Sequence, residues 1–213
     1  MGIRQAFVAP LAFAAFAAFA ALGVAAAQAQ ALSGPELAHA LQRGGYVLVM
    51  RHASSPVQPP LASAADSANV AHERQLDEAG RNAAVAMGRA IKSLHIPLGD
   101  VWTSPTYRAR QTVALAKLPQ PTSVAQLGDG GQSMSAAAED QSAWLRGKAA
   151  EPPRPGTDAL IVTHLLNMTA AFGQEASSLP DGAALVFHPV VGGPPELVGR
   201  VGIEEWPRLA GER

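Results

Sequence analysis

Cysteine is absent from this sequence of 213 residues. Its absence excludes disulfides, thiolate nucleophiles and zinc sites built on cysteine, so stability must come from the hydrophobic core. Aromatic residues are scarce at 5%, whereas hydrophobic residues as a whole reach 48%. We therefore expect a core built mainly from alanine and aliphatic side chains.

An excess of charge of either sign is also lacking. The chain has 16 lysine and arginine residues against 17 aspartate and glutamate residues. Without Arg4, which lies in a segment that we expect to be removed, the balance is 15 against 17, a net charge of −2. This balance argues against nucleic acid or an anionic membrane surface as the main partner.

Long apolar runs are missing beyond the first thirty or so residues, so no membrane span is expected there. In that first segment Arg4 precedes the apolar run Phe7–Ala26, and Ala27-Gln28-Ala29 has the small residues that a signal peptidase requires. The sequence thus predicts a signal peptide over residues 1–29 and a periplasmic or secreted protein. Cleavage after Ala31 is an alternative site, and retention as an anchor is another outcome because the run is nearly long enough to span a bilayer.

The remaining residues, 30–213, alternate between helix and strand patterns, and their number suits one domain with a real core. A short helix through Leu37 and Leu41 should end at Gly44-Gly45. Longer helices are expected over Asp77–Leu94, Thr106–Lys117 and Ser135–Lys148, and strands over Tyr46–Met50, Asp100–Thr103, Ser123–Leu127, Ala159–Val162, Ala183–Phe187 and Leu197–Ile203. The alternation predicts a three-layer α/β/α sandwich with a mostly parallel central sheet.

The strand Tyr46–Met50 runs directly into Arg51 and His52. Residues at the carboxyl end of such a strand lie where open α/β sheets bind their ligands. Arginine offers a planar fork of donors that suits phosphate. Histidine offers a ring nitrogen that acts as nucleophile or base near neutral pH. The pair therefore suggests phosphate chemistry.

Two further strand ends repeat this pattern. Val101–Thr103 leads into a helix that bears Arg108, and Leu160–Val162 leads into His164. We expect these side chains to meet Arg51 and His52 at one edge of the sheet. Four cations in one crevice repel one another unless an anion lies between them.

These motifs resemble those of the histidine phosphatase superfamily, which includes cofactor-dependent phosphoglycerate mutases and many phosphomonoesterases. The resemblance covers most of the mature chain through four motifs in order: Val49-Met50-Arg51-His52-Ala53, Arg74-Gln75-Leu76-Asp77-Glu78-Ala79-Gly80-Arg81, Trp102-Thr103-Ser104-Pro105 with Arg108-Ala109-Arg110-Gln111-Thr112, and Ile161-Val162-Thr163-His164. Ala53 replaces the usual glycine, and the tract from His52 to Arg74 is longer than in compact members. The chain looks nearest to the small exported branch that includes lipopolysaccharide heptose phosphatases.

The resemblance implies a phosphoglycerate mutase-like fold and a phosphatase that uses neither metal nor cofactor. His52 would attack phosphorus and form a phosphohistidine, which water then hydrolyses. The other ring nitrogen of His52 needs an acceptor, for which we expect a backbone carbonyl. Arg51, Arg108 and His164 would hold the phosphoryl oxygens in the transition state.

Other basic residues receive structural interpretations. Arg110 lies two residues from Arg108 on a different helical face, which favours an ion pair. Arg74 is expected to bind backbone or carboxylate rather than substrate. No motif accompanies the remaining histidines of the mature chain, His39, His72, His95 and His188.

The proton donor for the leaving group is the least defined residue. Many relatives supply a glutamate from the loop after the helix that bears Arg108, and another branch uses an aspartate after the second histidine. Leu165 follows His164, which closes the second option. Asp129, between glycines in the corresponding loop, is the candidate, and a turn aspartate is the alternative. Glu139 and Asp140 are expected to be solvated.

The sequence thus predicts an exported phosphatase that hydrolyses a small phosphomonoester through His52. A phosphohistidine protein phosphatase is an alternative, because good leaving groups need little help from an acid. A non-catalytic phosphate- or phosphoglycan-binding protein is another alternative. Such a protein would need no nucleophile, so the presence of His52 argues against it. The arginines oppose a metal site, and export opposes a glycolytic mutase.

Overall fold

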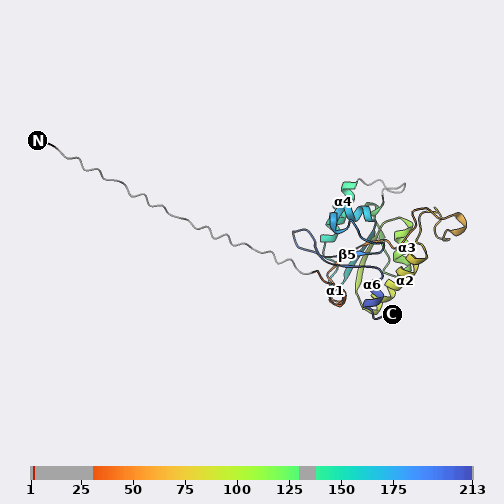
Figure 1. Ribbon diagram of the computed structural model, residues 1–213, viewed down its shortest axis with the longest axis horizontal. Helices are drawn as coiled ribbons and strands as arrows, with labels where there is room; N and C mark the ends of the chain where they lie inside the picture. The colour runs from red at the N-terminus through yellow and green to blue at the C-terminus, as the bar shows by residue number, and fades with distance from the viewer. Residues whose placement is uncertain (1, 3–30, 130–137, 213) are drawn as a thin grey trace.

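The computed structural model describes residues 2, 31–129 and 138–212 (Figure 1). The predicted signal peptide therefore lies outside the described residues except for Gly2, as do both predicted cleavage sites except for Ala31. Within the described ranges, no helix has the length and apolar character needed to cross a membrane.

The described residues form a six-stranded sheet in the order β3-β2-β4-β1-β5-β6. Its strands are β1 (Val47–Arg51), β2 (Leu98–Thr103), β3 (Thr122–Ser123), β4 (Asp158–Thr163), β5 (Ala184–His188) and β6 (Glu196–Val201). The pairs among β1, β2, β3 and β4 are parallel, and β5 and β6 are antiparallel to their neighbours. The mostly parallel sheet is thereby confirmed.

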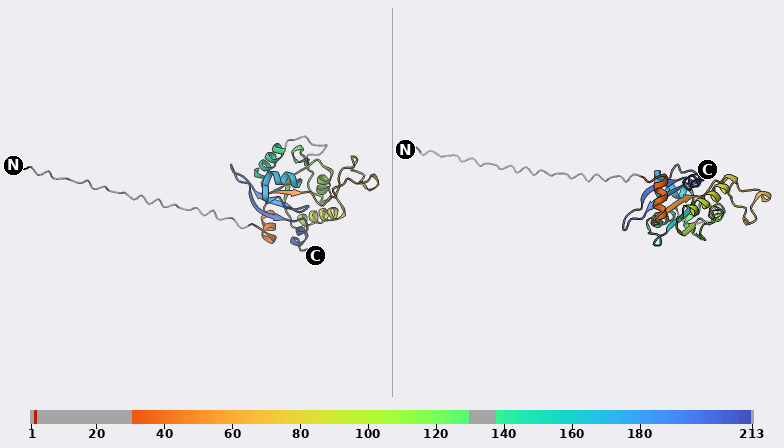
Figure 2. Two further views of the ribbon diagram at one scale, coloured as in Figure 1. Left: turned by 45° about the horizontal axis from the view of Figure 1, so that its top comes forward. Right: turned by 90° about the horizontal axis from the view of Figure 1, so that it is seen from below.

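Helices cover both faces of this sheet (Figure 2). Along β1, Leu48 and Met50 belong to the core that includes helix residues such as Trp206, whereas Val47 and Val49 face the opposite core. The first face is covered by α1 (Gly34–Gln42), α2 (Glu78–Ser93), α3 (Tyr107–Leu115) and α6 (Glu205–Leu209), and the second by α4 (Ala138–Ala150) and α5 (Leu165–Phe172). Because strand side chains alternate between faces, a fully apolar strand requires both layers. The three-layer α/β/α sandwich is confirmed.

Most predicted elements are present, with shifted ends. The helix α1 is followed by Gly44 and Gly45, whose positive φ values of 73° and 103° suit the predicted helix end. The predicted strand Ser123–Leu127 is wrong in extent, because only β3 pairs with β2 and the chain then turns into the short 3₁₀ helix η2 (Ala125–Leu127). Ser135, the predicted start of α4, lies outside the described residues.

Two helices and a short turn have no counterpart in the prediction. The helix α5 begins immediately after His164, and η3 (Gly173–Glu175) follows it. The helix α6 lies near the C-terminus. The sequence of α5 is apolar on most sides, so it lacks the polar face that marks an amphipathic helix.

The long tract Ser55–Ala71 projects from the body of the protein and contains the 3₁₀ helix η1 (Ala62–Ala64), as Figure 1 shows at the right. Buried amide side chains brace it: Asn69 Nδ2 donates to the carbonyl of Glu73 over 2.7 Å, and Gln75 Nε2 donates to that of Ala64 over 2.9 Å. These bonds join parts of the tract to one another, and its end is held to α3 because Gln111 Oε1 accepts from the backbone N–H of Leu76 over 2.7 Å.

Candidate active site

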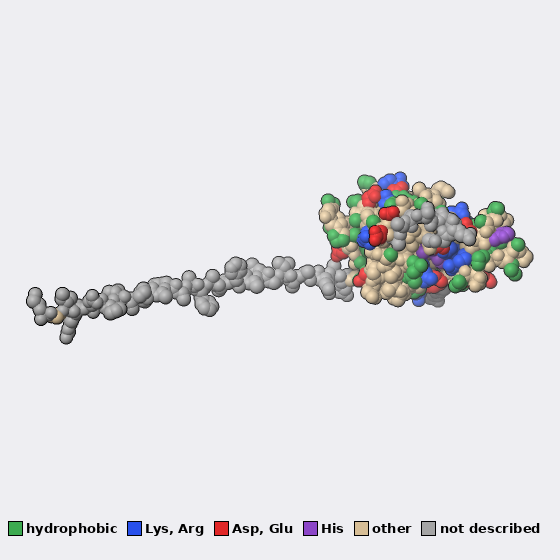
Figure 3. Space-filling model, turned by 90° about the horizontal axis from the view of Figure 1, so that it is seen from above, with side chains coloured by type: hydrophobic (Ala, Val, Ile, Leu, Met, Phe, Trp, Pro, Cys, Tyr) green, Lys and Arg blue, Asp and Glu red, His purple; other side chains and the backbone are tan. Residues whose placement is uncertain are grey.

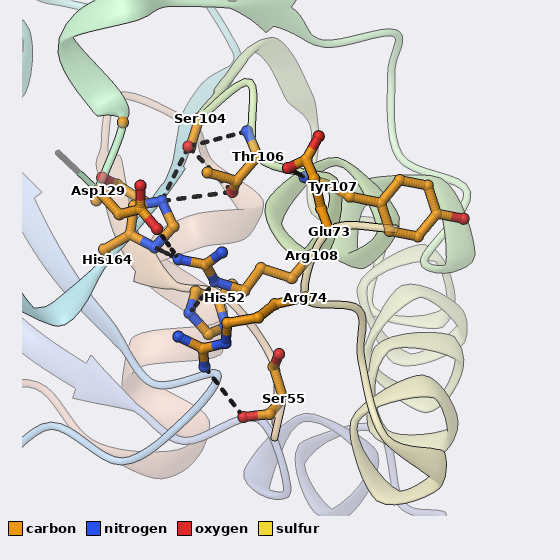
Figure 4. Close-up of polar contacts among 12 residues, drawn as sticks. His52, Ser55, Glu73, Arg74, Ser104, Thr106, Tyr107, Arg108, Asp129 and His164 are labelled. Atoms are coloured by element: carbon orange, nitrogen blue, oxygen red, sulfur yellow. Dashed lines mark hydrogen bonds and ion pairs between the residues drawn. The ribbon is translucent and has the colours of Figure 1, made fainter. Parts of the chain in front are cut away.

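The carboxyl ends of three neighbouring strands bring the predicted histidines together. The backbone N–H of His52, after β1, donates to Thr163 on β4 over 3.0 Å, and that of Ser104, after β2, donates to Val162 over 2.9 Å. The ring centroids of His52 and His164 lie 5.2 Å apart in an edge arrangement. Both side chains are buried, and Figure 4 shows them converging with Arg108. The expected meeting at one edge is confirmed.

The hydrogen-bond partners of the two ring nitrogens hold His52 in one tautomer. Its Nδ1 lies 2.8 Å from the carbonyl oxygen of Ala53, which can only accept, so Nδ1 carries the hydrogen. Its Nε2 accepts a hydrogen bond from Arg108 Nε over 3.1 Å. Nε2 therefore presents a lone pair toward the site, and the expected backbone acceptor is confirmed.

The charge state of His52 is set by its surroundings. Burial lowers the pKa of His52 to about 4, and the nearby charges of Arg108, Arg51 and Arg74 also lower it, against the raising effect of the Ala53 hydrogen bond. The ring is therefore neutral at pH 7. A neutral imidazole is the form that can act as a nucleophile.

His164 is likewise oriented on both sides. Arg108 Nη2 donates to its Nδ1 over 3.1 Å, so Nε2 carries the hydrogen and donates to Ser104 Oγ over 2.9 Å. Thr106 Oγ1 lies 3.4 Å from the same nitrogen. Burial is the main cause that lowers the pKa of His164, followed by Arg108. The site therefore does not hold four cations, because both histidines are neutral at pH 7 and the arginines that remain meet the carboxylates described below.

Arg108 links the parts of the site. It lies in the first turn of α3 with its side chain buried, and its Nη2 donates to Asp129 Oδ2 over 2.5 Å. The start of α3 is fixed by Glu73, whose Oε2 accepts from the backbone N–H of Tyr107 over 2.8 Å. A carboxylate at this end of a helix is favourable because it meets the helix dipole and unpaired N–H groups.

The loop that carries Asp129 is anchored to β4 and α5. Thr163 Oγ1 donates to the carbonyl of Leu127 over 3.0 Å, and Asn167 Nδ2 donates to that of Gly128 over 2.7 Å. Asp129 therefore lies in the site, as predicted, with about 29% of its side chain exposed. The following glycines, residues 130 and 131, lie outside the described residues.

Arg51 reaches the same edge but engages a different loop. Its Nη1 donates to the carbonyl of Leu179 over 2.9 Å, and its Nη2 lies 2.6 Å from Asp181 Oδ1. Asp181 is a charged group at the site that no sequence signal indicates. It lies just before β5, whose antiparallel pairing with β1 brings it there.

Arg74 binds the backbone, as predicted. Its Nε donates to the carbonyl of Pro56 over 2.7 Å and its Nη2 to that of Ser55 over 3.2 Å. Figure 4 also places its guanidinium beside His52, whose pKa it helps to lower. The sequence interpretation thus missed a third arginine at the site. The ion pair predicted for Arg110 is confirmed by Glu73 Oε1 at 4.0 Å.

The motif from Arg74 to Arg81 supports the segment after the nucleophile. Asp77 caps α2 by accepting from the N–H of Gly80 over 2.7 Å, and its other oxygen accepts from Ser54 Oγ over 2.7 Å. Thr112 on α3 adds a second support, since its Oγ1 accepts from the N–H of Ala53 over 3.2 Å. Ala53, which stands where glycine is usual, is fully buried there.

The remaining histidines lie away from this cluster. His39 is in α1, His72 in the projecting tract, His95 after α2 and His188 at the end of β5. In the part of the chain that the structure describes, no group of three or more histidine, cysteine, aspartate or glutamate residues could hold a metal ion. A space-filling view shows basic and histidine side chains near the middle of the face seen from above (Figure 3).

Comparisons with known proteins identify the fold. No protein-family model and no curated protein matches the sequence. The structure of the protein histidine phosphatase SixA complexed with tungstate matches with a TM-score of 0.54 and 20% identity, over 74% of this chain and 97% of that one. A phosphoserine phosphatase from Entamoeba histolytica in complex with phosphoserine matches with a TM-score of 0.50 and 14% identity, over 75% and 98%.

A third solved structure is that of the open reading frame Rv3214 from Mycobacterium tuberculosis. It matches with a TM-score of 0.50 and 18% identity, over 73% of this chain and 96% of that one. The chain therefore has the fold of the histidine phosphatase, or phosphoglycerate mutase-like, superfamily, as its motifs predict.

Proposed function

We propose that this protein is a phosphatase that transfers the phosphoryl group of a small phosphorylated substrate to His52 and then to water. The observation that carries this proposal is the state of His52. Its Nδ1 hydrogen is held by the carbonyl of Ala53, and its neutral Nε2 faces the guanidinium of Arg108. A fixed tautomer beside a phosphate-binding donor is the arrangement that nucleophilic attack on phosphorus needs.

The first step forms a bond between Nε2 and phosphorus while the bond from phosphorus to the leaving oxygen breaks. Arg108 Nε, which now donates to Nε2, transfers its hydrogen bond to a phosphoryl oxygen when substrate binds. Arg51, Arg74 and Arg108 neutralise the charge that spreads over these oxygens. The ring of His164, whose centroid lies 5.2 Å from that of His52, belongs to the same cluster.

The second step hydrolyses the phosphohistidine. During the first step the departing oxygen takes a proton from the Asp129 carboxyl group, which lies in the site beside Arg108, and in the second step the resulting carboxylate accepts a proton from the attacking water. The bond between water oxygen and phosphorus forms as the bond to Nε2 breaks. Phosphate leaves, and both His52 and Asp129 return to their starting states.

The proposal includes activity without added metal or cofactor and resistance to chelators, because nucleophile, phosphate donors and acid all come from the chain. It also includes export, with residues 1–29 as a cleaved signal. Sequencing the N-terminus of protein recovered from the periplasm or medium tests the export; a chain that still begins at Met1 would contradict cleavage.

Protein phosphohistidine is the second candidate substrate. SixA, which shares the fold, is described as a protein histidine phosphatase. An imidazole leaving group also needs less help from an acid than an alkoxide does. A panel of sugar phosphates, nucleotides, phytate and phosphohistidine peptides at pH 5 to 8 separates the two candidates.

Trapping of the covalent intermediate tests the proposed function directly. Mature protein is mixed with a radiolabelled phosphoester and quenched in base, and the protein-bound phosphate is then tested for acid lability. We expect labelling of the wild type and of His39→Ala, a matched control on the surface of α1, but not of His52→Ala. Equal labelling of His52→Ala would reject the mechanism, and tight binding without turnover would indicate a phosphate-binding protein.

A further inference from the structure

A cavity of about 490 Å³ lies at the C-terminal ends of α2 and α3. The two helices pack against each other (Figure 1), and Gly88 lets them come close because a Cβ there would overlap the carbonyl group of Ala116. The cavity is separate from the active site. It reaches Leu98, at the start of β2, and Leu115, at the end of α3, whereas Arg108 lies in the first turn of that helix.

Two helix ends of the same kind build the walls of this cavity. After α2, His95 has a positive φ of 56°, and the N–H of Ile96 donates to the carbonyl of Ile91 over 3.1 Å. After α3, Lys117 has a positive φ of 53°, and the N–H of Leu118 donates to the carbonyl five residues before it over 3.3 Å. Both are Schellman ends, in which the chain turns back on its helix. The apolar residues Ile96 and Leu118 are thereby fixed in the wall of the cavity.

The interior of the cavity is apolar and is partly open to solvent. Val85 is 38% exposed although it is apolar, and Leu98, Leu115 and Leu118 are half-buried. An apolar ligand would remove these side chains from water, which favours binding. The volume lies within the range of about 300–1,000 Å³ that is typical of small-molecule sites. Six of the lining residues have branched aliphatic side chains: Val85, Ile91, Ile96, Leu98, Leu115 and Leu118.

The rim of the cavity is cationic. Arg89, Lys92 and Lys117 contribute to the lining, and none of the described residues that line the cavity is acidic. Arg89 is partly neutralised by Glu212, whose Oε2 lies 3.9 Å from Arg89 Nη2. In the described part of the chain no ion pair involves Lys92 or Lys117, and both are exposed. An anionic group at the rim would therefore meet two ammonium groups that have no carboxylate partner.

We propose that this cavity is a second ligand site, which binds a single-chain amphiphile with an anionic head group. The apolar chain enters between the two helix ends, and the head group meets Lys92 and Lys117. Lysines at helix C-termini also interact with the helix dipole, but the dipole gives no reason for aliphatic side chains to stay uncovered beside them. The inference is independent of the proposed function, because no residue of the cavity belongs to the active site.

Two amphiphiles with the same chain and opposite head-group charge test the proposal. Decanoate and decyltrimethylammonium are each titrated, below their micelle concentrations, into protein with isotope-labelled methyl groups, and binding is followed by NMR. We expect decanoate to shift the methyl signals of Ile91, Ile96 and Leu118 until they saturate. Decanoate should bind about 10-fold more tightly than the cation, because attraction by the two lysines is replaced by repulsion.

The charge preference should disappear when both lysines are replaced. The variant combines Lys92→Gln with Lys117→Asn, because asparagine tolerates the left-handed φ at position 117. Its matched control combines Arg146→Gln with Lys148→Gln, which removes the same two charges from α4 on the opposite face of the sheet. The control should keep the wild-type preference for decanoate.

Four results would overturn the inference. Equal affinity of the wild type for both amphiphiles would show an apolar cavity without charge selectivity. Loss of the preference in the α4 control as well would show that it follows net charge alone. Methyl shifts only elsewhere in the protein, or none below the micelle concentration, would show that the cavity binds no amphiphile. Cavity signals that shift with protein concentration alone would show that a second copy of the chain covers it. All four leave the labelling of His52, and with it the proposed function, unaffected.

Discussion

Gly80, in the first turn of α2, lies so close to Ser54 that a Cβ on Gly80 would stand 2.2 Å from the carbonyl oxygen of Ser54. The cap residue Asp77 binds the same segment through Ser54 Oγ and through its own N–H. The start of α2 is thereby pressed against the chain two residues after the nucleophile. This contact explains how Asp77 and Gly80 support the segment after the nucleophile, while Arg74 of the same motif reaches the site itself.

Gly80→Ala should destabilise the protein and reduce its activity together. The added methyl group meets backbone rather than a flexible side chain, so α2 must move away from Ser54. We expect a loss of about 2 kcal/mol or more in the free energy of unfolding, measured by denaturant titration. Gly147→Ala in α4 is the control, because nothing lies within 4 Å of its added Cβ. That variant should gain up to about 1 kcal/mol from helix propensity.

Arg108→Lys should lower kcat by about 10²-fold, because an ammonium cannot reproduce a fork that now contacts His52, His164 and Asp129. Arg110→Lys, in the same helix, is the matched control. Arg110 is about half exposed and pairs with Glu73 only at 4.0 Å, so kcat should change by less than about 2-fold. Similar losses in both variants would show that Arg108 acts through helix stability.

Asp129→Asn should lower the rate of hydrolysis of an ester by an amount that depends on its leaving group. If Asp129 donates the proton, an alkyl phosphate should lose about 10²-fold in kcat, and p-nitrophenyl phosphate, which leaves without protonation, should lose much less. Asp140→Asn, an exposed substitution in the first turn of α4, should leave both rates unchanged. Unchanged rates for Asp129→Asn on both esters would exclude it as the acid.

The acidic limb of the pH–rate profile should report His52. Because burial lowers its pKa to about 4, the neutral nucleophile persists down to that pH, and kcat/KM is lost as the pH falls through it. Arg74→Gln removes one of the cations that lower this pKa, so the limb should move to higher pH. The ionisation of the substrate is common to both proteins and cancels in the comparison. A limb that moves to lower pH in the variant would contradict the assignment.

The same value has a consequence for stability. The pKa of the His52 ring is about 4 in the folded protein, whereas its ordinary value, which applies to the unfolded chain, is 6.5. As the pH falls, the unfolded chain therefore binds a proton at His52 before the folded protein does. Burial of this neutral ring therefore costs stability progressively between pH 6.5 and 4. His52→Gln should show a smaller loss of unfolding free energy across this window, as measured by denaturant titration at each pH.

Local patterns account for the parts of the site that the sequence predicts. The apolar run of β1 must be buried between two layers, and a polar pair directly after it must emerge at the sheet edge. The same argument places His164 after β4 and Arg108 in the first turn of α3. Because parallel strands share one carboxyl edge, their convergence follows from the order of elements.

The parts that were not predicted depend on contacts between distant segments. Asp181 follows His52 by more than a hundred residues and approaches Arg51 only because β5 pairs antiparallel with β1. Arg74 is held beside His52 by its hydrogen bonds to the carbonyls of Pro56 and Ser55 at the start of the projecting tract, and such bonds have no periodic signal in the sequence. The shortened β3 likewise reflects the turn of the chain into η2, which follows after two residues have paired with β2.

The sequence by itself determined the layered fold, the strand ends that bear the two histidines, and the chemistry to which those residues are suited. Only the tertiary structure decided the charge balance of the site. The charge of a histidine depends on its burial and on its neighbours, and an arginine's freedom to bind phosphate depends on the carboxylate opposite it. Both are set by the packing of loops that lie far apart in the chain, so the site holds neutral histidines and two arginine–aspartate pairs rather than four bare cations.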